Sequence, residues 1–494
     1  MNNETLYERL GLTRDASPEE IRRAYRQLVL HLHPDTNANA GETELFLGIQ
    51  QAFETLSDSE KKAEYDHQLP QEPTTPLPLH IKLNFSQPSL IRLTEPQLIY
   101  ALLELTIHPD STEAISSTPL NLSLVLDCST SMQGDRLDTV KTTAIDLLRQ
   151  LQPKDIISLV KFSDRADLLI PASNIADLIS AEMKIQLLQA GGGTEIYKGL
   201  ESGFNQVRQF RAINRINHII MITDGRTYGD EESCERLADQ AAALGIGISA
   251  LGIGSQWNDS FLDHLTSKTG GFCKYISKVG EIRSFLLEKI ARLGSSFAEH
   301  VTYNFETPRG VELTTAFRLQ PDSSPLGTTP PLVLGYVPQH GIQSLLLEFT
   351  IKDISENLDY ITLMKGHLNY EVPSNSYKTS YTQRLILDRP ISAEPIEEVP
   401  PHSILQAMLM LSLYRMQERA REEMGKGDIS AATRRLQNLA THLLDQGERD
   451  LARSVLSEVA YIQNNQSFSE DGEKRIKYST RSLLLPARIK ESRL

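Results

Sequence analysis

The order of apolar and polar positions predicts an α/β domain in the middle of the chain. Four segments are apolar runs of strand length: Asn121–Leu126, Ile156–Phe162, Ile219–Thr223 and Ile246–Gly252. Helical stretches are expected after them, including the segment Ile175–Leu188 and the spaced apolar residues Leu137, Val140, Ala144, Leu147 and Leu151. Alternating strands and helices favour a mainly parallel sheet with helices on both faces, and we place this domain at residues 119–295.

Short alternating segments on both sides of this domain predict a β-sandwich that is split in two. Apolar and polar residues alternate in the region His80–Ile107 and in Val301–Phe305, Val311–Leu319, Leu345–Ile351 and Tyr360–Tyr370. Proline, glycine and asparagine separate these segments, as is typical of turns between strands. We expect the first strands in residues 80–118 and the rest in residues 296–394. A proline-containing linker at residues 70–79 precedes them.

The last part of the chain, residues 403–494, is predicted to be helical and follows a second linker at residues 395–402. Turns are expected at Gly427-Asp428 and Gly447-Glu448. One face of the middle helix is predicted to carry Ala431, Leu436, Leu439, Leu443 and Leu444. The pattern favours a helical hairpin or three-helix cap that docks on the rest of the chain. A tetratricopeptide-like binding role is the alternative, although no repeat persists over the three units that a solenoid needs.

The first seventy residues predict a hairpin of two helices. Ser17, Pro18 and Glu20 form a helix start with a capping box. An apolar face follows at Ile21, Ala24, Tyr25, Leu28 and Leu32, with Arg22, Arg23 and Arg26 on the other side. Pro34 ends this helix, because proline disfavours the α conformation in the residue before it. A second helix is expected through Phe46, Ile49, Phe53 and Leu56, and a short third helix through Tyr65.

These residues, with the tripeptide His33-Pro34-Asp35, resemble a J-domain, and the resemblance runs from Leu6-Tyr7 to Glu64-Tyr65-Asp66. We assign residues 1–69 to this domain. The resemblance implies that Arg22, Arg23 and Arg26 dock on an acidic surface of an Hsp70 chaperone of the DnaK type. It also implies that His33, Pro34 and Asp35 promote ATP hydrolysis by that partner. Gln27 and Leu47 stand where the family usually has basic residues, so the basic surface is sparse.

Oxygen-bearing side chains follow the predicted strands of the α/β domain. Asp127, Ser129 and Ser131 come after the first strand, Thr194 ends the loop Gly191-Gly192-Gly193-Thr194, and Asp224 ends the strand His218–Thr223. Ligands of such sheets bind outside the carboxyl ends of the strands. Hard oxygen donors with only two carboxylates favour Mg²⁺, with Mn²⁺ or Ca²⁺ as alternatives, whereas softer metals prefer histidine or cysteine.

The set DxSxS, GGT and TDG resembles the metal-ion-dependent adhesion site of von Willebrand factor A domains, whose fold is Rossmann-like. The resemblance implies that Ser129, Ser131 and Thr194 face the metal. Asp127 and Asp224 would hold the metal mostly through waters and hydroxyls, and a carboxylate of the partner would take the last coordination position. Cys128, between the ligands, is predicted to point to the core.

Composition narrows the function further. The chain has 494 residues, enough for three or four domains, and a net charge of −14, which argues against a nucleic-acid partner. No signal peptide and no apolar run of membrane-spanning length is visible, so we expect a cytoplasmic protein without membrane contact. The three cysteines are widely spaced and suggest neither a zinc site nor a disulfide framework.

Catalysis is not expected, because the sequence has no GxSxG elbow and no phosphate-binding GxxxxGK[ST] loop. His218 is interpreted as a structural residue that precedes a strand. The leading hypothesis is a non-enzymatic adaptor that stimulates Hsp70 and recruits it to a protein partner bound through Mg²⁺. The alternative is a metal-dependent scaffold for an AAA+ ATPase assembly in which the J-domain is secondary. Extracellular adhesion is disfavoured by the missing signal sequence.

Overall fold

The computed structural model divides the chain into two compact units, Met1–Pro76 and Leu77–Leu494. Each unit is described by itself. The structure describes residues 6–10, 21–22, 24–26, 29, 40–58, 61–62, 64–65, 77–109, 111, 118–174, 177–226, 229–352, 354, 358–373 and 379–483.

The first unit is helical, as predicted. It contains α1 (Leu6–Arg9) and α3 (Ala40–Leu56), and residues 21–22, 24–26 and 29 are also helical. Its core includes the buried side chains of Tyr7, Ile21, Ala24, Ile49 and Leu56. The rings of Tyr25 and Phe53 stack with their centroids 4.0 Å apart, which joins the first predicted helix to the second.

Arg22 and Arg26 are exposed on the face opposite Ile21, and Arg26 Nε lies 3.4 Å from the Arg22 carbonyl oxygen. The predicted basic face is therefore present at these two positions. His33-Pro34-Asp35, Arg23 and the capping box of Ser17 and Glu20 lie outside the described residues.

The centre of the second unit is a six-stranded sheet in the order β6-β5-β4-β7-β8-β9. Its strands are β4 (Leu120–Asp127), β5 (Ile156–Phe162), β6 (Ala166–Ser173), β7 (Ile216–Thr223), β8 (Gly247–Ile253) and β9 (Cys273–Ile276). All neighbours are parallel except β6, which runs antiparallel to β5 at the edge. The sequence did not predict β6, since the next element expected after β5 was the helical segment Ile175–Leu188, and it did not predict the short β9.

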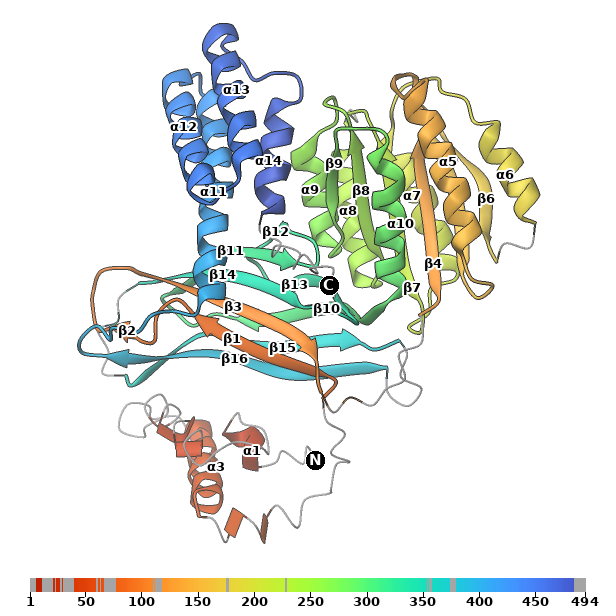
Figure 1. The fold of residues 1–494 in the computed structure, drawn as a ribbon. Helices are drawn as coiled ribbons and strands as arrows, with labels where there is room; N and C mark the ends of the chain where they lie inside the picture. The colour runs from red at the N-terminus through yellow and green to blue at the C-terminus, as the bar shows by residue number, and fades with distance from the viewer. Residues whose placement is uncertain are drawn as a thin grey trace, which may run out of the picture. The chain divides into compact units, whose positions relative to one another are not determined.

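Helices cover both faces of this sheet, as predicted (Figure 1). One face is covered by α5 (Asp135–Gln150), α6 (Leu178–Gln186) and α10 (Glu281–Gly294). The other face is covered by α7 (Ile196–Gln209), α8 (Glu231–Ala243) and α9 (Asp259–Lys268). A short 3₁₀ helix, Thr130–Met132, follows β4.

The flanks form two five-stranded sheets that share one core, so the predicted β-sandwich is present. The first sheet has the order β1 (Leu79–Phe85), β3 (Gln97–Ile107), β14 (Gln343–Ile351), β11 (Val311–Gln320) and β12 (Ser324–Leu326). The second has the order β13 (Leu332–Pro338), β10 (Ser296–Glu306), β15 (Tyr360–Glu371), β16 (Ser380–Ser392) and β2 (Leu90–Ile91). Strands from before and after the α/β domain pair directly, as β3 does with β14.

Between residues 402 and 483 the chain forms four helices rather than two or three. They are α11 (His402–Gly425), α12 (Ile429–Asp445), α13 (Arg449–Asn465) and α14 (Gly472–Ser482). The turns at Gly427 and Gly447 are where the sequence placed them, and both glycines have a positive φ that other residues rarely adopt. The prediction for the face of α12 was partly wrong. Leu436, Leu439 and Leu443 are buried, but Leu444 is 49% exposed.

Helix α11 packs on the outer face of the first sandwich sheet, where Ile404, Leu411 and Tyr414 share a buried cluster with Phe317 and Leu346. The helical region therefore docks on the rest of the unit, as the sequence favoured. Arg415 on α11 also pairs with Glu348 on β14 at 2.6 Å. Burial raises the pKa of Glu348, but the hydrogen bonds from Arg415 and Tyr100 outweigh it and hold this pKa at about 2.

The Glu348–Arg415 pair predicts a specific loss of stability in acid. The folded-state pKa of Glu348 lies below its ordinary value of 4.5, so its contribution is complete above that pH and disappears as the pH falls toward 2. We expect the free energy of unfolding of the wild type to lose about 3 kcal/mol more over this range than that of Glu348→Gln. Urea denaturation at several pH values measures the difference. Glu312→Gln, which removes an exposed pair with Lys352, should keep the wild-type slope.

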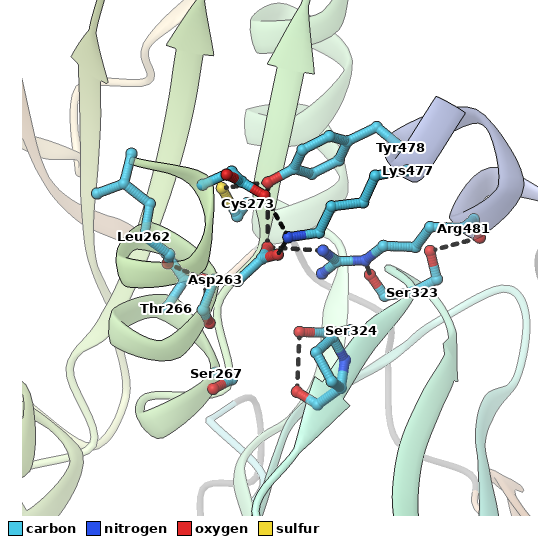
Figure 2. Close-up of polar contacts among 12 residues, drawn as sticks. Leu262, Asp263, Thr266, Ser267, Cys273, Ser323, Ser324, Lys477, Tyr478 and Arg481 are labelled. Carbon is cyan, nitrogen blue, oxygen red and sulfur yellow. Dashed lines mark hydrogen bonds and ion pairs between the residues drawn. The ribbon is translucent and has the colours of Figure 1, made fainter. Parts of the chain in front are cut away.

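Buried charges join the helical region to the α/β domain (Figure 2). Asp263 on α9 lies 2.6 Å from Arg481 Nη1 and 2.8 Å from Lys477 Nζ, and it accepts a hydrogen bond of 3.2 Å from the Tyr478 hydroxyl. These three partners all belong to α14. Burial raises the pKa of the neighbouring Asp259, but the charges of Lys477 and Arg421 hold it at about 2.

The same junction includes the β-sandwich. The guanidinium of Arg318 on β11 is buried and donates to the carbonyl oxygens of Gly270 at 2.7 Å and Leu334 at 2.9 Å. The Arg481 carbonyl oxygen accepts a hydrogen bond of 2.9 Å from Ser323 Oγ. Residues of all three parts of the second unit therefore meet at one buried polar cluster. None of the helices described is both long enough and apolar enough to cross a bilayer.

Candidate metal site at the carboxyl edge of the sheet

Two neighbouring strands bring the candidate aspartates to one edge of the sheet. β4 and β7 are parallel with Leu126 opposite Ile222, so Asp127 lies level with Thr223 and Asp224 comes one residue further on. The glycine loop before Thr194 is attached to the segment after β4. Gly191 N donates to the Cys128 carbonyl oxygen at 2.8 Å, and Thr130 N donates to that of Gly192 at 3.1 Å. The three separate sequence segments therefore converge at one place.

Hydrogen bonds connect four of the five candidate ligands. Asp127 accepts from Ser129 N at 2.8 Å through one carboxylate oxygen. Ser129 Oγ lies 3.1 Å from Ser131 Oγ, and Ser131 Oγ donates to Asp224 at 2.7 Å. The hydroxyls and carboxylates thus form one continuous group of oxygen donors.

The fifth candidate, Thr194, lies against the backbone that follows Asp224. A β carbon built on Gly225 would lie 2.7 Å from Thr194 Oγ1, so only glycine allows this close approach. The structure therefore brings together Asp127, Ser129, Ser131, Thr194 and Asp224, the set predicted from the sequence.

The electrostatics of this edge favour a cation. Asp127 and Asp224 are both buried with 0% exposure. Burial raises the pKa of Asp127, hydrogen bonds from Ser129 and Thr223 lower it, and the nearby charge of Asp224 raises it. Two buried carboxylates next to each other repel unless positive charge compensates them. Arg136 pairs with Asp224 and supplies part of that charge, and Asp127 has no cationic side chain among its described hydrogen-bond partners.

The donors present fit a hard divalent ion, because carboxylate and hydroxyl oxygens are the ligands that Mg²⁺ and Ca²⁺ prefer. Cys128 is buried in the core beneath α5, as predicted, and burial raises the pKa of its thiol to about 11. A thiol with that pKa is a poor metal ligand at neutral pH. In the described part of the chain, no cluster of three or more histidine, cysteine, aspartate or glutamate side chains could hold a metal, so a metal at this edge would depend on the hydroxyl oxygens as well as the two carboxylates.

The sequence missed three residues that support the site. Thr223 Oγ1 donates to the second oxygen of Asp127 at 2.6 Å. Arg136 on α5 forms an ion pair with Asp224. Asp164 accepts from Gly193 N at 2.7 Å and so holds the glycine loop in place. The motif TDG contained Thr223, but Arg136 and Asp164 could not be found, because their partners are distant in the sequence.

His218 is not a site residue. It lies inside β7 rather than before it, which corrects the sequence interpretation of its position. Its Nε2 lies 2.8 Å from Ser249 Oγ on β8, and burial lowers its pKa to about 4. A neutral, hydrogen-bonded histidine in the sheet agrees with the structural role assigned to it.

An exposed apolar stripe lies on α6 and continues just past its end, shortly before the glycine loop in the sequence. Ile179, Met183 and Leu187 are 74%, 59% and 77% exposed, and their spacing of four residues places them on one side of the helix. Ala181 and Ile185 on the other side are buried. Exposed apolar side chains that form a row are typical of interaction surfaces. The stripe ends four residues before Gly191.

The fold and the oxygen-rich edge together define a von Willebrand factor A domain, and the comparisons with known proteins agree. The family model described as von Willebrand factor type A domain matches residues 121–288. The DnaJ domain model matches residues 5–66, so the chain carries both of the modules recognised in the sequence. A third model, described as Sll0103-like, C-terminal alpha-helical domain, matches residues 402–486.

A similar protein over most of the length is "Uncharacterized protein sll0103" of Synechocystis, which is 25% identical over 386 residues, 74% of this chain and 89% of that protein. The chaperone protein DnaJ of Streptococcus agalactiae is 50% identical over 66 residues. That match spans only 18% of the chaperone's length and 13% of this chain.

Two solved structures have a similar fold. A von Willebrand factor type A protein from Catenulispora acidiphila gives a TM-score of 0.65 at 13% identity, with 81% of this chain and 96% of that chain covered. The ArnB paralog VWA2 from Sulfolobus acidocaldarius gives 0.54 at 16% identity, with 82% and 98% covered. The predicted multi-domain fold class is thus confirmed.

Proposed function

We propose that this chain is a non-enzymatic adaptor that recruits an Hsp70 chaperone to a protein partner held through a divalent metal ion. The observation that carries the proposal is the convergence of Asp127, Ser129, Ser131, Thr194 and Asp224 at one edge of a domain whose chain also contains a J-domain. The J-domain would bind a chaperone, and the von Willebrand factor A domain would bind a ligand with an acidic group.

The five oxygen-bearing side chains would hold Mg²⁺, and Mn²⁺ or Ca²⁺ could replace it. The bound ion would offer a coordination position to a carboxylate oxygen of the partner. Binding rather than catalysis is proposed, because four of the five candidate ligands are hydrogen-bonded to one another as a set of oxygen donors. His218 on β7 is buried and bonded within the sheet. Thr223 and Ser129 N orient the carboxylate of Asp127 for this task.

The partner is proposed to be a protein segment with an acidic residue and aliphatic side chains. Ile179, Met183 and Leu187 support this choice, because a small hydrophilic ligand would leave their exposed surface uncovered. Three side chains are far less than the roughly 800 Å² per partner that a stable protein interface needs. The interface would therefore also have to include the metal edge of the same domain.

The J-domain is proposed to act on an Hsp70 of the DnaK type. Arg22 and Arg26 are exposed on the surface of the helix, and Arg23 belongs to the same basic segment in the sequence. His33, Pro34 and Asp35 would promote ATP hydrolysis by the chaperone. The match to the DnaJ domain over residues 5–66 supports this assignment.

We expect the full chain to stimulate single-turnover ATP hydrolysis by a DnaK-type Hsp70 and His33→Gln to lose most of that stimulation. The substitution removes the imidazole of the tripeptide and leaves the described core of the J-domain unchanged. His442→Gln, at an exposed position on α12, serves as the matched control and should stimulate like the wild type. Equal rates for the wild type and His33→Gln would refute the co-chaperone role.

A pull-down with and without EDTA tests the adaptor as a whole. Retention of Hsp70 in ATP, together with a second protein that EDTA releases, supports the proposal. An AAA+ ATPase that EDTA releases, without retention of Hsp70, would instead favour the metal-dependent scaffold and overturn the proposal.

A further inference from the structure

The loop between β8 and α9, residues 254–258, lies next to the candidate metal site. The Gln256 carbonyl oxygen accepts a hydrogen bond of 2.8 Å from Arg226 Nε, and Arg226 follows Asp224 by two residues. A β carbon built on Gly254 would lie 3.1 Å from Arg136 Nη2, so the guanidinium that pairs with Asp224 rests against this glycine. The loop therefore contacts two arginines that flank the same metal-site carboxylate.

The other side of this loop is held by the C-terminal helical region. Glu470, just before α14, accepts hydrogen bonds from Ser255 Oγ at 3.2 Å and from Gln256 Nε2 at 3.3 Å. Lys474 on α14 donates to the Ser255 carbonyl oxygen, and its Nζ lies 5.3 Å from the centroid of the Trp257 ring. Two charged side chains of the helical region thus hold three consecutive residues of the loop.

Trp257 makes the loop stiff. Its side chain is fully buried, and its Nε1 donates to the Gly254 carbonyl oxygen at 2.8 Å. The indole lies so close to Gly252 that a β carbon there would be 2.0 Å from Trp257 Cε2. Its ring centroid is 5.8 Å from that of Tyr478 on α14. A displacement of α14 would therefore move the whole loop rather than a single side chain.

Helix α14 is itself fixed to the α/β domain. Lys477 and Arg481 pair with Asp263 in the buried cluster shown in Figure 2, one and two turns beyond Lys474 on the same helix. A continuous set of contacts consequently leads from this anchored helix through the loop to the surroundings of Asp224. The path reaches the candidate ligands through the ion pair between Arg136 and Asp224.

We propose that the C-terminal helical region positions the metal site, with Glu470 and Lys474 fixing the loop 254–258 and, through Gln256 and Gly254, the two arginines beside Asp224. The inference rests on the proposed function in one respect, namely that the site binds a divalent ion. The inference assigns the helical region a role in metal binding, in addition to its packing on the rest of the unit. Release of the loop would weaken metal binding although every ligand is intact. Because coupling is reciprocal, metal binding would also stabilise the contact of α14 with the loop.

The test uses the full chain and Mg²⁺ alone. The double variant Glu470→Gln/Lys474→Met removes both charged contacts, and titration calorimetry should show an Mg²⁺ dissociation constant raised by about fivefold to tenfold. Lys268→Met on α9, which breaks only a pair with Asp239, is the matched control and should bind like the wild type. The single variant Lys474→Arg keeps a donor at that position and should recover most of the affinity.

A second variant keeps the test independent of folding. Gln256 is exposed, so Gln256→Glu should fold normally, yet it places a carboxylate beside Glu470 and should weaken Mg²⁺ binding as well. Hydrogen exchange adds a readout that a purely structural role would not change. Mg²⁺ should slow exchange in residues 470–482 of the wild type and should not do so in the double variant.

The possible outcomes distinguish the positioning role of the helical region from the proposed function. If the wild type binds Mg²⁺ and neither Glu470→Gln/Lys474→Met nor Gln256→Glu changes the affinity, the positioning role is wrong and the proposed function stands. If the wild type binds no divalent ion, both fail. Weaker binding in both variants, with normal binding in Lys268→Met, supports the inference.

Discussion

Asp263→Asn is expected to lower the free energy of unfolding of the second unit by about 3–5 kcal/mol, the usual effect of removing one partner from a buried ion pair. Asp263 is 5% exposed and faces Lys477 and Arg481, which are 3% and 2% exposed. The amide cannot balance two buried cations. Asp259 also pairs with Lys477, but the structure gives Arg481 no other ion pair in its described surroundings. Arg481 is therefore the group that loses its counter-charge.

Urea denaturation followed by tyrosine fluorescence and circular dichroism measures this effect. The α14 end of the helical region should detach first, and a transition at lower denaturant should appear. Asp239→Asn is the matched control, because it removes an aspartate that pairs with Lys268 at the surface. Exposed pairs contribute about 1 kcal/mol or less. If Asp263→Asn unfolds like Asp239→Asn, the buried cluster does not hold the helical region in place.

Asp127→Ala is expected to reduce the affinity for Mg²⁺ by at least about a hundredfold, because one of only two carboxylates in the donor set is lost. The expected loss of Mg²⁺ affinity is larger than the loss from removing one ligand alone. Both oxygens of Asp127 organise neighbours, since they accept from Ser129 N and from Thr223 Oγ1. Without them the segment that presents Ser129 and Ser131 loses its anchor. The change in fold should be small, because the alanine fits where a desolvated carboxylate stood.

Titration calorimetry with MgCl₂ on the full chain measures the loss, and MnCl₂ provides a second ion. Asp135→Ala is the control: this aspartate is exposed in the first turn of α5 and contacts none of the five candidate ligands in the described structure. Equal uptake of Mg²⁺ by the wild type and Asp127→Ala would rule out the metal site.

The candidate ligands could be predicted from the sequence because they lie in three short motifs. Each ligand follows directly after a strand or ends a glycine loop, and parallel strands place such positions together. The central strands and α5 follow from their own apolar patterns, and α6 lies within the helical segment expected at residues 175–188. Helices were also expected after β7 and β8, where α8 and α9 lie, but α7 and α10 were not predicted individually. The edge strand β6 was missed for a physical reason. It contains Pro171 and an irregular pairing with β5, and only one of its side chains, Ile170, is buried.

Helix α14 was not recognised as a separate helix within the predicted helical region, because its buried face is charged. Lys474, Lys477 and Arg481 are 7%, 3% and 2% exposed, although residues of these types normally mark a solvent face. Their burial is possible only because α9, far away in the sequence, supplies Asp259 and Asp263. No local pattern contains that information. The same reasoning applies to Arg136 and Arg226, whose partners lie on other elements.

Strands that pair in the β-sandwich are translated at widely separated times. β3 pairs with β14, Ile99 lying opposite Phe349, yet the entire α/β domain is translated between these strands. At roughly 5–20 residues per second, the ribosome needs tens of seconds to supply the missing partner. During that time the apolar faces of β1 and β3 stay uncovered, whereas the contiguous α/β domain can already fold. We therefore expect the nascent chain to be most prone to aggregation, and most dependent on chaperones, after β3 has emerged and before β14 does.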